Sequence, residues 1–398
     1  MKATKPKILF LPETFPPDPG GIAVSALRIS TLLAPQLGGV CVFTTTPRLP
    51  DGHLQKEEHE GLVVYRMGLS PDEGRCLLAA TEAVCDIISQ ERIDLLHAIS
   101  LAQRAAWVAV TAACRMGRPS VVGVRGNDFD RDIFDGKRAP FRLEVLKKAS
   151  AITTVSSELA HRVRCLCPRR HIRYITNSVD GSYFCPGPAE PNFRQELKVA
   201  PEELLFGFVG VARAKKGIDE LLAAFCALLP DFPLRLALIG GARRDGEEML
   251  DEYHASFPKI CGKVDLLPYL PRQEVRAFYR SCDLLVLPSR SEGMPNALLE
   301  ALAVGRPVAA RPVSGVKDIM ASSKRPILFP LAGGGASGFL GDTIKEGLLQ
   351  AIKTPAAQRE RRGRAGRVAV MRHHSKLDER VGYLRLYAEL LGRDYLEP

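Results

Sequence analysis

The stretch "DLLVLPSRSEGMPNALLEALAVGRPVAARP" (283–312) contains one complete unit of an alternating fold. It opens with an apolar run at 283–289, which a loop follows. The apolar residues of 296–305 then recur at helical spacing. A second apolar run follows at 307–312. A strand, a helix and a second strand in this order predict a parallel βαβ arrangement and therefore an α/β fold.

Two carboxylates lie in this stretch, Glu292 in the loop and Glu300 in the helix. A carboxylate among Ala and Leu residues needs a partner, because burying an unpaired charge is costly. The vicinal hydroxyls of a ribose would provide one, since a carboxylate accepts hydrogen bonds from two hydroxyl groups. The alternative is an ordinary helix glutamate that pairs with a neighbouring arginine.

The same alternation occurs on both sides of a Pro-, Gly- and Asn-rich segment at 177–197. We therefore predict two doubly wound Rossmann-like α/β domains that face each other across a cleft. The expected domains are residues 1–185 and 186–375, with a C-terminal helix (376–398) that packs back on the first domain. Strands are expected at 5–13, 39–46, 62–68, 93–100, 120–126 and 151–156, and then at 204–212, 234–241, 264–270, 283–289 and 307–312.

The composition is that of a soluble globular enzyme, with 46% hydrophobic and 25% charged residues among 398. No apolar run approaches the roughly 20 residues of a membrane span. The N-terminal run "ILFLP" is too short for a signal peptide, so a cytoplasmic, unprocessed protein is expected. The ten cysteines include no CxxC pair, which favours reduced thiols over a zinc site or a disulfide framework.

The net charge of +10 is unevenly distributed, because residues 101–200 carry 17 Lys and Arg against 9 Asp and Glu. A basic surface favours anionic partners. Nucleic acid is not expected, since no nucleic-acid-binding signature is present. The expected partner is the inner face of a membrane, in peripheral contact with Arg138, Arg142, Lys147 and Lys148. A plain solvated surface is the alternative.

Two loops after predicted strands are suited to phosphate binding. Gly20 and Gly21 allow the backbone to approach an anion at a helix N-terminus, although a tight turn is the alternative. Arg213, Lys215 and Lys216 supply clustered cations after the strand at 204–212, although they are also typical of a charged surface. Neither loop matches GxGxxG, so a dinucleotide cofactor is not supported.

Taken together, these segments resemble the family-4 retaining glycosyltransferases, which have the two-domain GT-B architecture. The specific match is "EGMPNALLE" (292–300), the E-x7-E motif, followed by "ALAVGRPVAARPVSGVKDI" (301–319). Supporting matches are "FPPDPGG" (15–21), "DLLH" (94–97), "TTVSSEL" (153–159), "NSVD" (177–180), "VGVARAKKG" (209–217) and "LIGG" (238–241).

The resemblance implies transfer of a sugar from a nucleotide diphosphate-sugar, with retention of the anomeric configuration. By position, Glu300 would bind the ribose and Glu292 would lie at the donor sugar. Arg213 and Lys216 would neutralise the leaving diphosphate, so no metal and no cofactor are expected. The backbone amides of the segment 293–296 would face the sugar and phosphates, and Gly21 would bring its amide to the diphosphate. The donor-binding residues are therefore expected to be Gly20, Gly21, Gly293, Met294, Pro295, Asn296 and Glu300.

Two positions depart from the family pattern. The family often carries "HG-x-D" where this chain has Arg125, Gly126, Asn127 and Asp128. Arg125 and His97 are therefore assigned to the acceptor or sugar side, and Asp128 to catalysis. The arginine that the family places five residues before the loop lysine is Val211 here, so Arg213 is expected to replace it.

Donor and acceptor are left open by the motifs. A UDP-sugar is the first expectation and GDP-mannose the second, with a glycan, a lipid-linked molecule or a small molecule as acceptor. Two other functions fit the same pattern, a sugar-nucleotide epimerase and a non-catalytic binding subunit of a membrane assembly. Incubation with donor and acceptor separates the three, because they give transfer, epimerisation, or binding without turnover.

Overall fold

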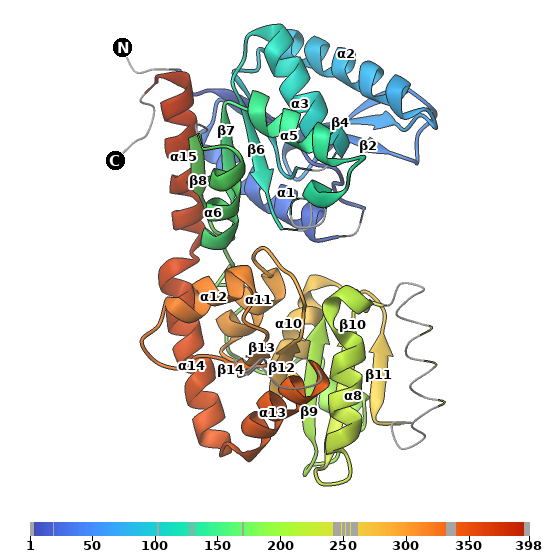
Figure 1. The fold of residues 1–398 in the computed structure, drawn as a ribbon, viewed down its shortest axis with the longest axis vertical. Helices are drawn as coiled ribbons and strands as arrows, with labels where there is room; N and C mark the ends of the chain where they lie inside the picture. Colours follow the sequence, from blue (N-terminus) through green and yellow to red (C-terminus); the bar gives the residue numbers. More distant parts are fainter. Residues whose placement is uncertain are drawn as a thin grey trace. The chain divides into compact units, whose positions relative to one another are not determined.

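The computed structural model describes residues 4–18, 20–101, 103–126, 129, 132–168, 171–241, 248, 251, 255, 262–331 and 340–393. The chain forms two compact units (Figure 1). Unit 1 comprises 1–176 together with 376–398, and unit 2 comprises 177–375. Each unit has its own buried apolar core, and each is an α/β unit as the alternation of strands and helices predicts.

Unit 1 is built on an eight-stranded sheet with the order β3-β4-β2-β1-β5-β6-β7-β8. All of its strand pairs are parallel except β3 with β4. The six strands expected in this part of the sequence are all present. The strands are β1 (Lys7–Leu11), β2 (Gly39–Thr46), β3 (Leu54–His59), β4 (Leu62–Gly68), β5 (Leu95–Ala98), β6 (Ser120–Val124), β7 (Ala151–Thr154) and β8 (His171–Tyr174).

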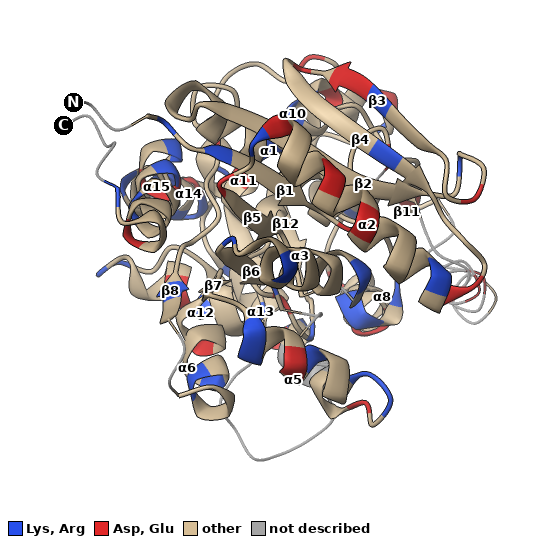
Figure 2. Cartoon of the chain, turned by 90° about the horizontal axis from the view of Figure 1, so that it is seen from above, with Lys and Arg blue, Asp and Glu red and all other residues tan. Residues whose placement is uncertain are grey.

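The helices of unit 1 pack in two groups, α1 with α15 and α2 with α3 and α5 (Figure 2). The direction of winding reverses at β1, which lies between β2 and β5. The C-terminal helix α15 belongs to the core of this unit, where Tyr383 and Tyr387 are fully buried. The helices are α1 (Gly21–Leu33), α2 (Glu73–Glu91), α3 (Gln103–Met116), α5 (Ala139–Lys148), α6 (Ser157–Leu166) and α15 (Lys376–Leu391), with short 3-10 turns η1 (Ala34–Gln36) and η2 (Asp132–Phe134).

Unit 2 contains a six-stranded parallel sheet with the order β11-β10-β9-β12-β13-β14. The first strand, β9, lies between β10 and β12, so the direction of winding reverses there. In such sheets ligands bind beyond the carboxyl ends of the strands at this switch point. The strands are β9 (Leu204–Val209), β10 (Leu234–Ile239), β11 (Val264–Leu267), β12 (Leu284–Leu287), β13 (Val308–Ala310) and β14 (Phe329–Pro330).

The helices of unit 2 pack in the same layered manner, α8 with α13 in one group and α10 with α11 and α14 in another. The apolar side chains of α8 and α13 form one core cluster with those of the strands. The helices are α7 (Phe193–Glu196), α8 (Ile218–Leu228), α10 (Arg272–Ser281), α11 (Asn296–Val304), α12 (Ser314–Ala321), α13 (Leu340–Lys353) and α14 (Ala356–His373), with the 3-10 turn η3 (Ala214–Lys216).

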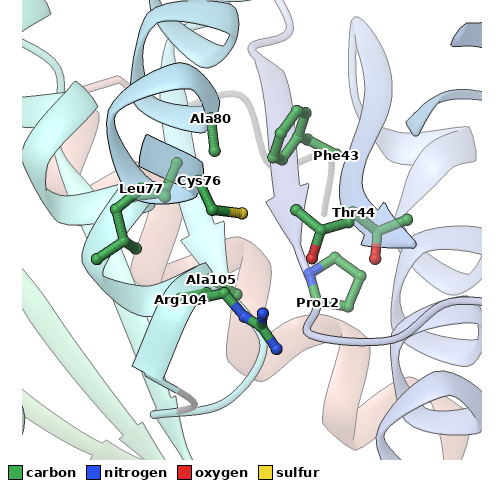
Figure 3. A pocket seen from close by; sticks show the side chains of 10 residues that line it. Pro12, Phe43, Thr44, Cys76, Leu77, Ala80, Arg104 and Ala105 are labelled. Atoms are coloured by element: carbon green, nitrogen blue, oxygen red, sulfur yellow. The ribbon is translucent and has the colours of Figure 1, made fainter. Parts of the chain in front are cut away.

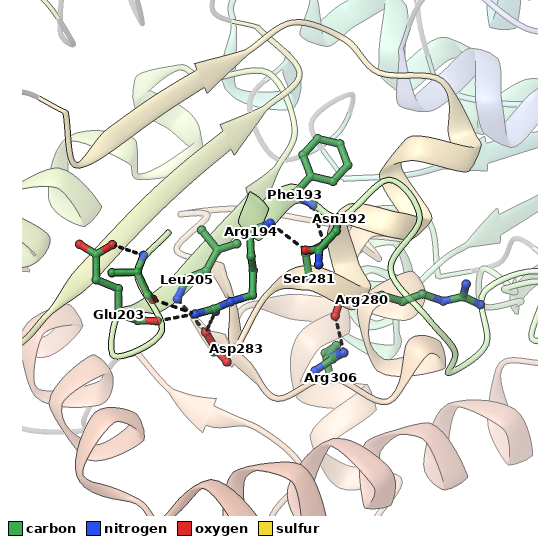
Figure 4. Close-up of polar contacts among 10 residues, drawn as sticks. Asn192, Phe193, Arg194, Glu203, Leu205, Arg280, Ser281, Asp283 and Arg306 are labelled. Atoms are coloured by element: carbon green, nitrogen blue, oxygen red, sulfur yellow. Dashed lines mark hydrogen bonds and ion pairs between the residues drawn. The ribbon is translucent and has the colours of Figure 1, made fainter. Parts of the chain in front are cut away.

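The irregular segment before β9 is fixed to unit 2 by polar contacts (Figure 4). Arg194 pairs with Asp283 across 2.5 Å and donates to the carbonyl of Glu203, and the same Asp283 carboxylate accepts from the amide of Leu205. Ser281 accepts from the amide of Phe193 at 3.1 Å. A segment without strands or long helices can be well ordered in this way, because side chains satisfy its backbone groups.

Three strands of the described residues were not predicted. In β3, "LQKEEH", the side chains are mostly exposed, and the sequence shows no apolar run. The strands β8 and β14 are only four and two residues long and lie at the edges of their sheets. Short edge strands bury few side chains, so they leave a weak hydrophobic signal.

Candidate donor-binding site

The candidate site lies at the switch point of unit 2, where one loop follows β9 and another follows β12. Gly217 ends the first loop with φ 69°, and a Cβ atom there would collide with the carbonyl of Pro288 in the second. The amide of Arg290 donates to the carbonyl of Lys215 at 3.1 Å. A glycine is therefore required at 217, since the two loops run against each other at backbone distance.

Lys216 and Glu292 form an ion pair between the two loops. Their side chains are 21% and 15% exposed, so the pair is partly shielded from water. Two residues that the sequence assigns to the diphosphate and to the donor sugar are thus in direct contact. Glu292 balances the charge of Lys216. A bound anion would therefore also be stabilised by the positive charge of Arg213, which lies in the same loop as Lys216.

Arg213 directly precedes η3 in extended conformation. Among the described residues its Nε atom is buried and has no hydrogen-bond partner. A buried guanidinium N–H without an acceptor costs free energy, and an anionic ligand would remove that cost. This orphaned donor is the feature of the site that most directly indicates an anionic ligand.

The segment 293–296 is held from two sides. The amide of Gly315 at the start of α12 donates to the carbonyl of Gly293 at 2.8 Å. The side-chain amide of Asn177 donates to the carbonyl of Met294 at 3.0 Å and to the side chain of Asn296 at 2.9 Å. Pro295 is extended and is the N-cap residue of α11, which begins at Asn296.

Glu300 lies in the second turn of α11 and is partly buried. The hydroxyl of Tyr279, on α10, donates to its Oε2 atom at 3.0 Å. Burial, and secondarily the Glu300 charge, raises the pKa of Tyr279 well above its ordinary value, so the phenol remains a donor. One carboxylate oxygen is therefore oriented by the protein, through a tyrosine hydroxyl.

The glycines expected to contact phosphate lie in unit 1. Gly20 has φ 139° and precedes α1, which begins at Gly21 without a side-chain cap. A Cβ atom built at either glycine meets nothing within 4 Å, so the space beside this helix start is open. An uncapped helix N-terminus with open space fits an anion, although it also fits water.

His97 lies on β5 and is fully buried, with its Nδ1 atom 2.6 Å from the hydroxyl of Tyr387 on α15. Burial, with a smaller contribution from the Arg125 charge, lowers the pKa of His97 to about 3. The imidazole is therefore neutral and engaged with the C-terminal helix. Arg125 follows β6 and is partly buried. Asp128, assigned to catalysis from the sequence, lies outside the described residues.

A small pocket that sequence reasoning did not identify lies in unit 1 near the carboxyl ends of β1 and β2 (Figure 3). Arg104 extends into this space, and its Nε pairs with Glu13 at 3.2 Å. The hydroxyl of Thr44 is buried without a partner among the described residues. Most other lining side chains are apolar: Pro12, Phe43, Cys76, Leu77, Ala80, Ala105 and Val108.

Sequence reasoning also missed an ion cluster beside the donor loops, with a buried glutamate at its centre. Glu220, in the first turn of α8, pairs with Arg290 and with Arg311. The three residues lie far apart in the sequence, and "KGIDELLAAF" reads as an ordinary amphipathic helix start. The signal that was available is an arginine within three residues of the end of each of two buried strands, Arg290 after β12 and Arg311 after β13.

Comparison with known proteins assigns both units. Residues 189–367 match the family model described as glycosyl transferases group 1, and residues 20–178 match the glycosyl transferase 4-like domain. A D-inositol 3-phosphate glycosyltransferase from Kribbella flavida is 26% identical over 87% of this chain and 86% of its own length.

Solved structures show the same fold. Sucrose-phosphate synthase from Thermosynechococcus elongatus superposes with a TM-score of 0.81 and 19% identity, over 98% of this chain and 99% of that one. The HepE protein of Anabaena, in complex with UDP and glucose, gives 0.78 and 17% over 96% and 100%.

The two family matches and the paired α/β units define a two-domain glycosyltransferase. The chain belongs to the family-4 glycosyltransferases of the GT-B architecture. The family, the fold class and the enzyme class predicted from the E-x7-E stretch are thereby confirmed. It transfers a sugar from a nucleotide-sugar.

Proposed function

We propose that this enzyme is a retaining, metal-independent glycosyltransferase that uses a UDP-sugar. The observation that carries the proposal is the orphaned, buried Nε of Arg213 beside the Lys216–Glu292 pair at the switch point of unit 2. Two cations at this position suit a diphosphate leaving group. GDP-mannose is the second candidate donor. UDP is placed first because the HepE structure, similar in fold, holds UDP and glucose.

The proposed chemistry needs no protein nucleophile. As the bond between the sugar and the diphosphate breaks, positive charge develops at the anomeric carbon and negative charge on the diphosphate. Arg213 and Lys216 would stabilise the diphosphate, and Glu292 would lie at the donor sugar. The leaving phosphate would take the proton of the acceptor hydroxyl on the same face, which retains the configuration.

The donor is tested by a thermal-shift panel of nucleotide sugars. A ligand that binds only the folded form raises stability by about 2.7 kcal/mol at 100 times its Kd. We expect UDP-sugars to give the largest shift, and GDP-mannose a smaller one. An Arg213→Ala variant should lose most of the shift. A panel in which only guanine nucleotides stabilise the protein would contradict the UDP assignment.

The reaction is tested by incubating the active donor with glycan, lipid-linked and small-molecule acceptors. Nuclear magnetic resonance of the anomeric proton reports the configuration of the product. The α-linked product of an α-linked donor is expected. Donor epimerisation without acceptor would favour the epimerase, and binding without turnover would favour a silent subunit.

We also propose that unit 1 contacts an anionic membrane peripherally. No helix among the described residues is long and apolar enough to cross a bilayer. On α5, Lys147, Lys148 and Phe141 are exposed, and Phe134, in the adjoining η2, is 86% exposed. Arg142, expected in this surface, is instead buried and donates to the carbonyl of Leu101.

Vesicle co-sedimentation tests this contact. Replacing Lys147 and Lys148 by Gln should weaken binding to vesicles that contain an anionic lipid, since each basic residue near such a surface contributes about 1 kcal/mol. Phe134→Ser should weaken it further, whereas Tyr269→Ser, which removes an aromatic side chain of 68% exposure elsewhere, should not. Equal sedimentation of all variants would overturn the proposal.

A further inference from the structure

Glu220 is the buried centre of an ion cluster that joins three elements of unit 2, with Arg290 at its exposed rim. Its Oε1 atom accepts from the Nε of Arg290 at 2.9 Å, in the loop after β12. Its Oε2 atom accepts from Arg311, the residue after β13. The side chains of Glu220 and Arg311 are 8% and 11% exposed, so water screens this pair little.

Stability alone is a weak reason for such a cluster. Taking charges out of water costs several kcal/mol per ion, and apolar residues of similar volume often serve as well. The cluster does fix geometry, because each of its three members is held by more than one contact. Arg290 also pairs with Asp219 across 2.5 Å, and the amide of Arg311 donates to the carbonyl of Leu287 at 3.1 Å.

The loop that the cluster holds is the one that carries Glu292. Arg290 lies two residues before Glu292, and its amide is bonded to the carbonyl of Lys215. Lys216, the next residue, pairs with Glu292. The backbone contact at 290 and the ion pair at 292 therefore run side by side between the two loops. Glu220 fixes the side chain of Arg290 on the same loop.

We propose that Glu220 is a positioning residue for sugar transfer, which sets the position of Glu292 and Lys216 through Arg290. The inference rests on the proposed role of Glu292 at the donor sugar. Glu220 itself acts only through the arginines. Displacing a catalytic group by about 1 Å can lower a rate by about 100-fold.

The test compares Glu220→Gln with Glu203→Gln. Glu203 is also a buried carboxylate of unit 2, paired with Lys263, but it precedes β9 and so lies at the amino ends of the strands, away from the loops that follow them. We expect Glu220→Gln to lower kcat at least tenfold while the Kd for the nucleotide diphosphate changes less than threefold. Glu203→Gln should lower Tm but leave kcat within twofold.

A second readout does not depend on activity. Hydrogen–deuterium exchange of the 288–296 segment should be faster in Glu220→Gln than in Glu203→Gln, because the loop loses one of its anchors. Equal exchange and equal kcat in the two variants would overturn the positioning role. The wild-type enzyme could transfer no sugar while exchange is still faster in Glu220→Gln. That result would contradict the proposed function, whereas the inference that Glu220 anchors the loop would stand.

Discussion

At the scale of single residues, the candidate site depends on a few charged side chains whose partners the structure defines. Lys216 contacts Glu292, and Tyr279 orients Glu300. The residue types and their spacing in "SEGMPNALLE" were sufficient to predict Glu292 and Glu300 as site residues. The roles of the two residues stay predictions. These pairings were not predictable, because Lys216 and Tyr279 approach the two carboxylates only once the strands are paired.

We predict that Glu300→Ala weakens binding of the nucleotide diphosphate by about 10- to 100-fold. A hydrogen bond to a charged group contributes about 1.5–3 kcal/mol, and the carboxylate is expected to accept from the ribose. Isothermal titration calorimetry measures the change. Tyr279→Phe is the matched control, since it keeps the carboxylate and removes one of its donors. An unchanged Kd for Glu300→Ala would rule out the ribose assignment.

The buried His97 predicts a pH dependence of stability. Its pKa is about 3 in the folded chain and about 6.5 when unfolded, so the unfolded chain takes up the proton first as the pH falls. The stability contributed by the neutral imidazole is complete above pH 6.5 and is lost as the pH falls toward 3. At pH 4.5 the loss is about 2–3 kcal/mol.

Urea unfolding at pH 7.5 and pH 4.5 measures this loss. His97→Gln keeps a polar side chain that can contact Tyr387 but does not titrate. The difference in the free energy of unfolding between the two pH values should be smaller in the variant by about 2–3 kcal/mol. The same pH dependence in both proteins would show that His97 does not control it.

At the scale of elements, the donor segment is shaped by close backbone contacts. The start of α12 lies against the segment 293–294, and a Cβ atom at Gly315 would collide with the carbonyl of Gly293 and approach Met294 Cα to 3.0 Å. The resemblance of "GRPVAARPVSG" to the family pattern indicated that a glycine is expected at position 315. The spatial reason for it appears only in the fold.

We predict that Gly315→Ala destabilises the enzyme by about 1–3 kcal/mol, as overpacking does, and weakens donor binding because 293–294 must shift. Thermal unfolding and donor titration measure the two effects. Gly136→Ala makes the same change where no atom lies within 4 Å of the new Cβ and should stay within about 0.5 kcal/mol. A Gly315→Ala variant as stable as the control would contradict the packing argument.

At the scale of the whole molecule, the alternation of strands and helices was sufficient to predict two α/β units. Long buried strands were predicted because their apolar runs are continuous, as in "KILFL" of β1. Exposed or very short strands such as β3 and β14 were not, since tertiary pairing rather than local pattern forms them.

The place of α15 in the core of unit 1 gives a prediction for the full chain. Ending the chain at residue 375 removes Tyr383, Leu384 and Tyr387, which are buried against this unit. Each large buried side chain contributes about 3–5 kcal/mol, so together the three approach the usual free energy of unfolding of a domain. Hydrogen exchange should then accelerate in β1 of unit 1 and remain slow in β9 of unit 2.

Ending the chain at residue 393, after α15, is the control, and it should leave both strands protected. Protection of β1 in the chain that ends at 375 would show that the helix is dispensable for this unit. Loss of protection in β9 as well would show that the two units do not unfold independently.

The division of unit 1 into two sequence segments also has a consequence for biosynthesis. The residues of α15 leave the ribosome only after all of unit 2 has been made. Domains usually fold in the order of their synthesis, N-terminal first. Here the unit that contains the N-terminus must wait for its last helix, and unit 2, although synthesised later, can complete its core sooner. During translation, the exposed surface that awaits Tyr383 and Tyr387 is therefore the part of the nascent enzyme most in need of a chaperone.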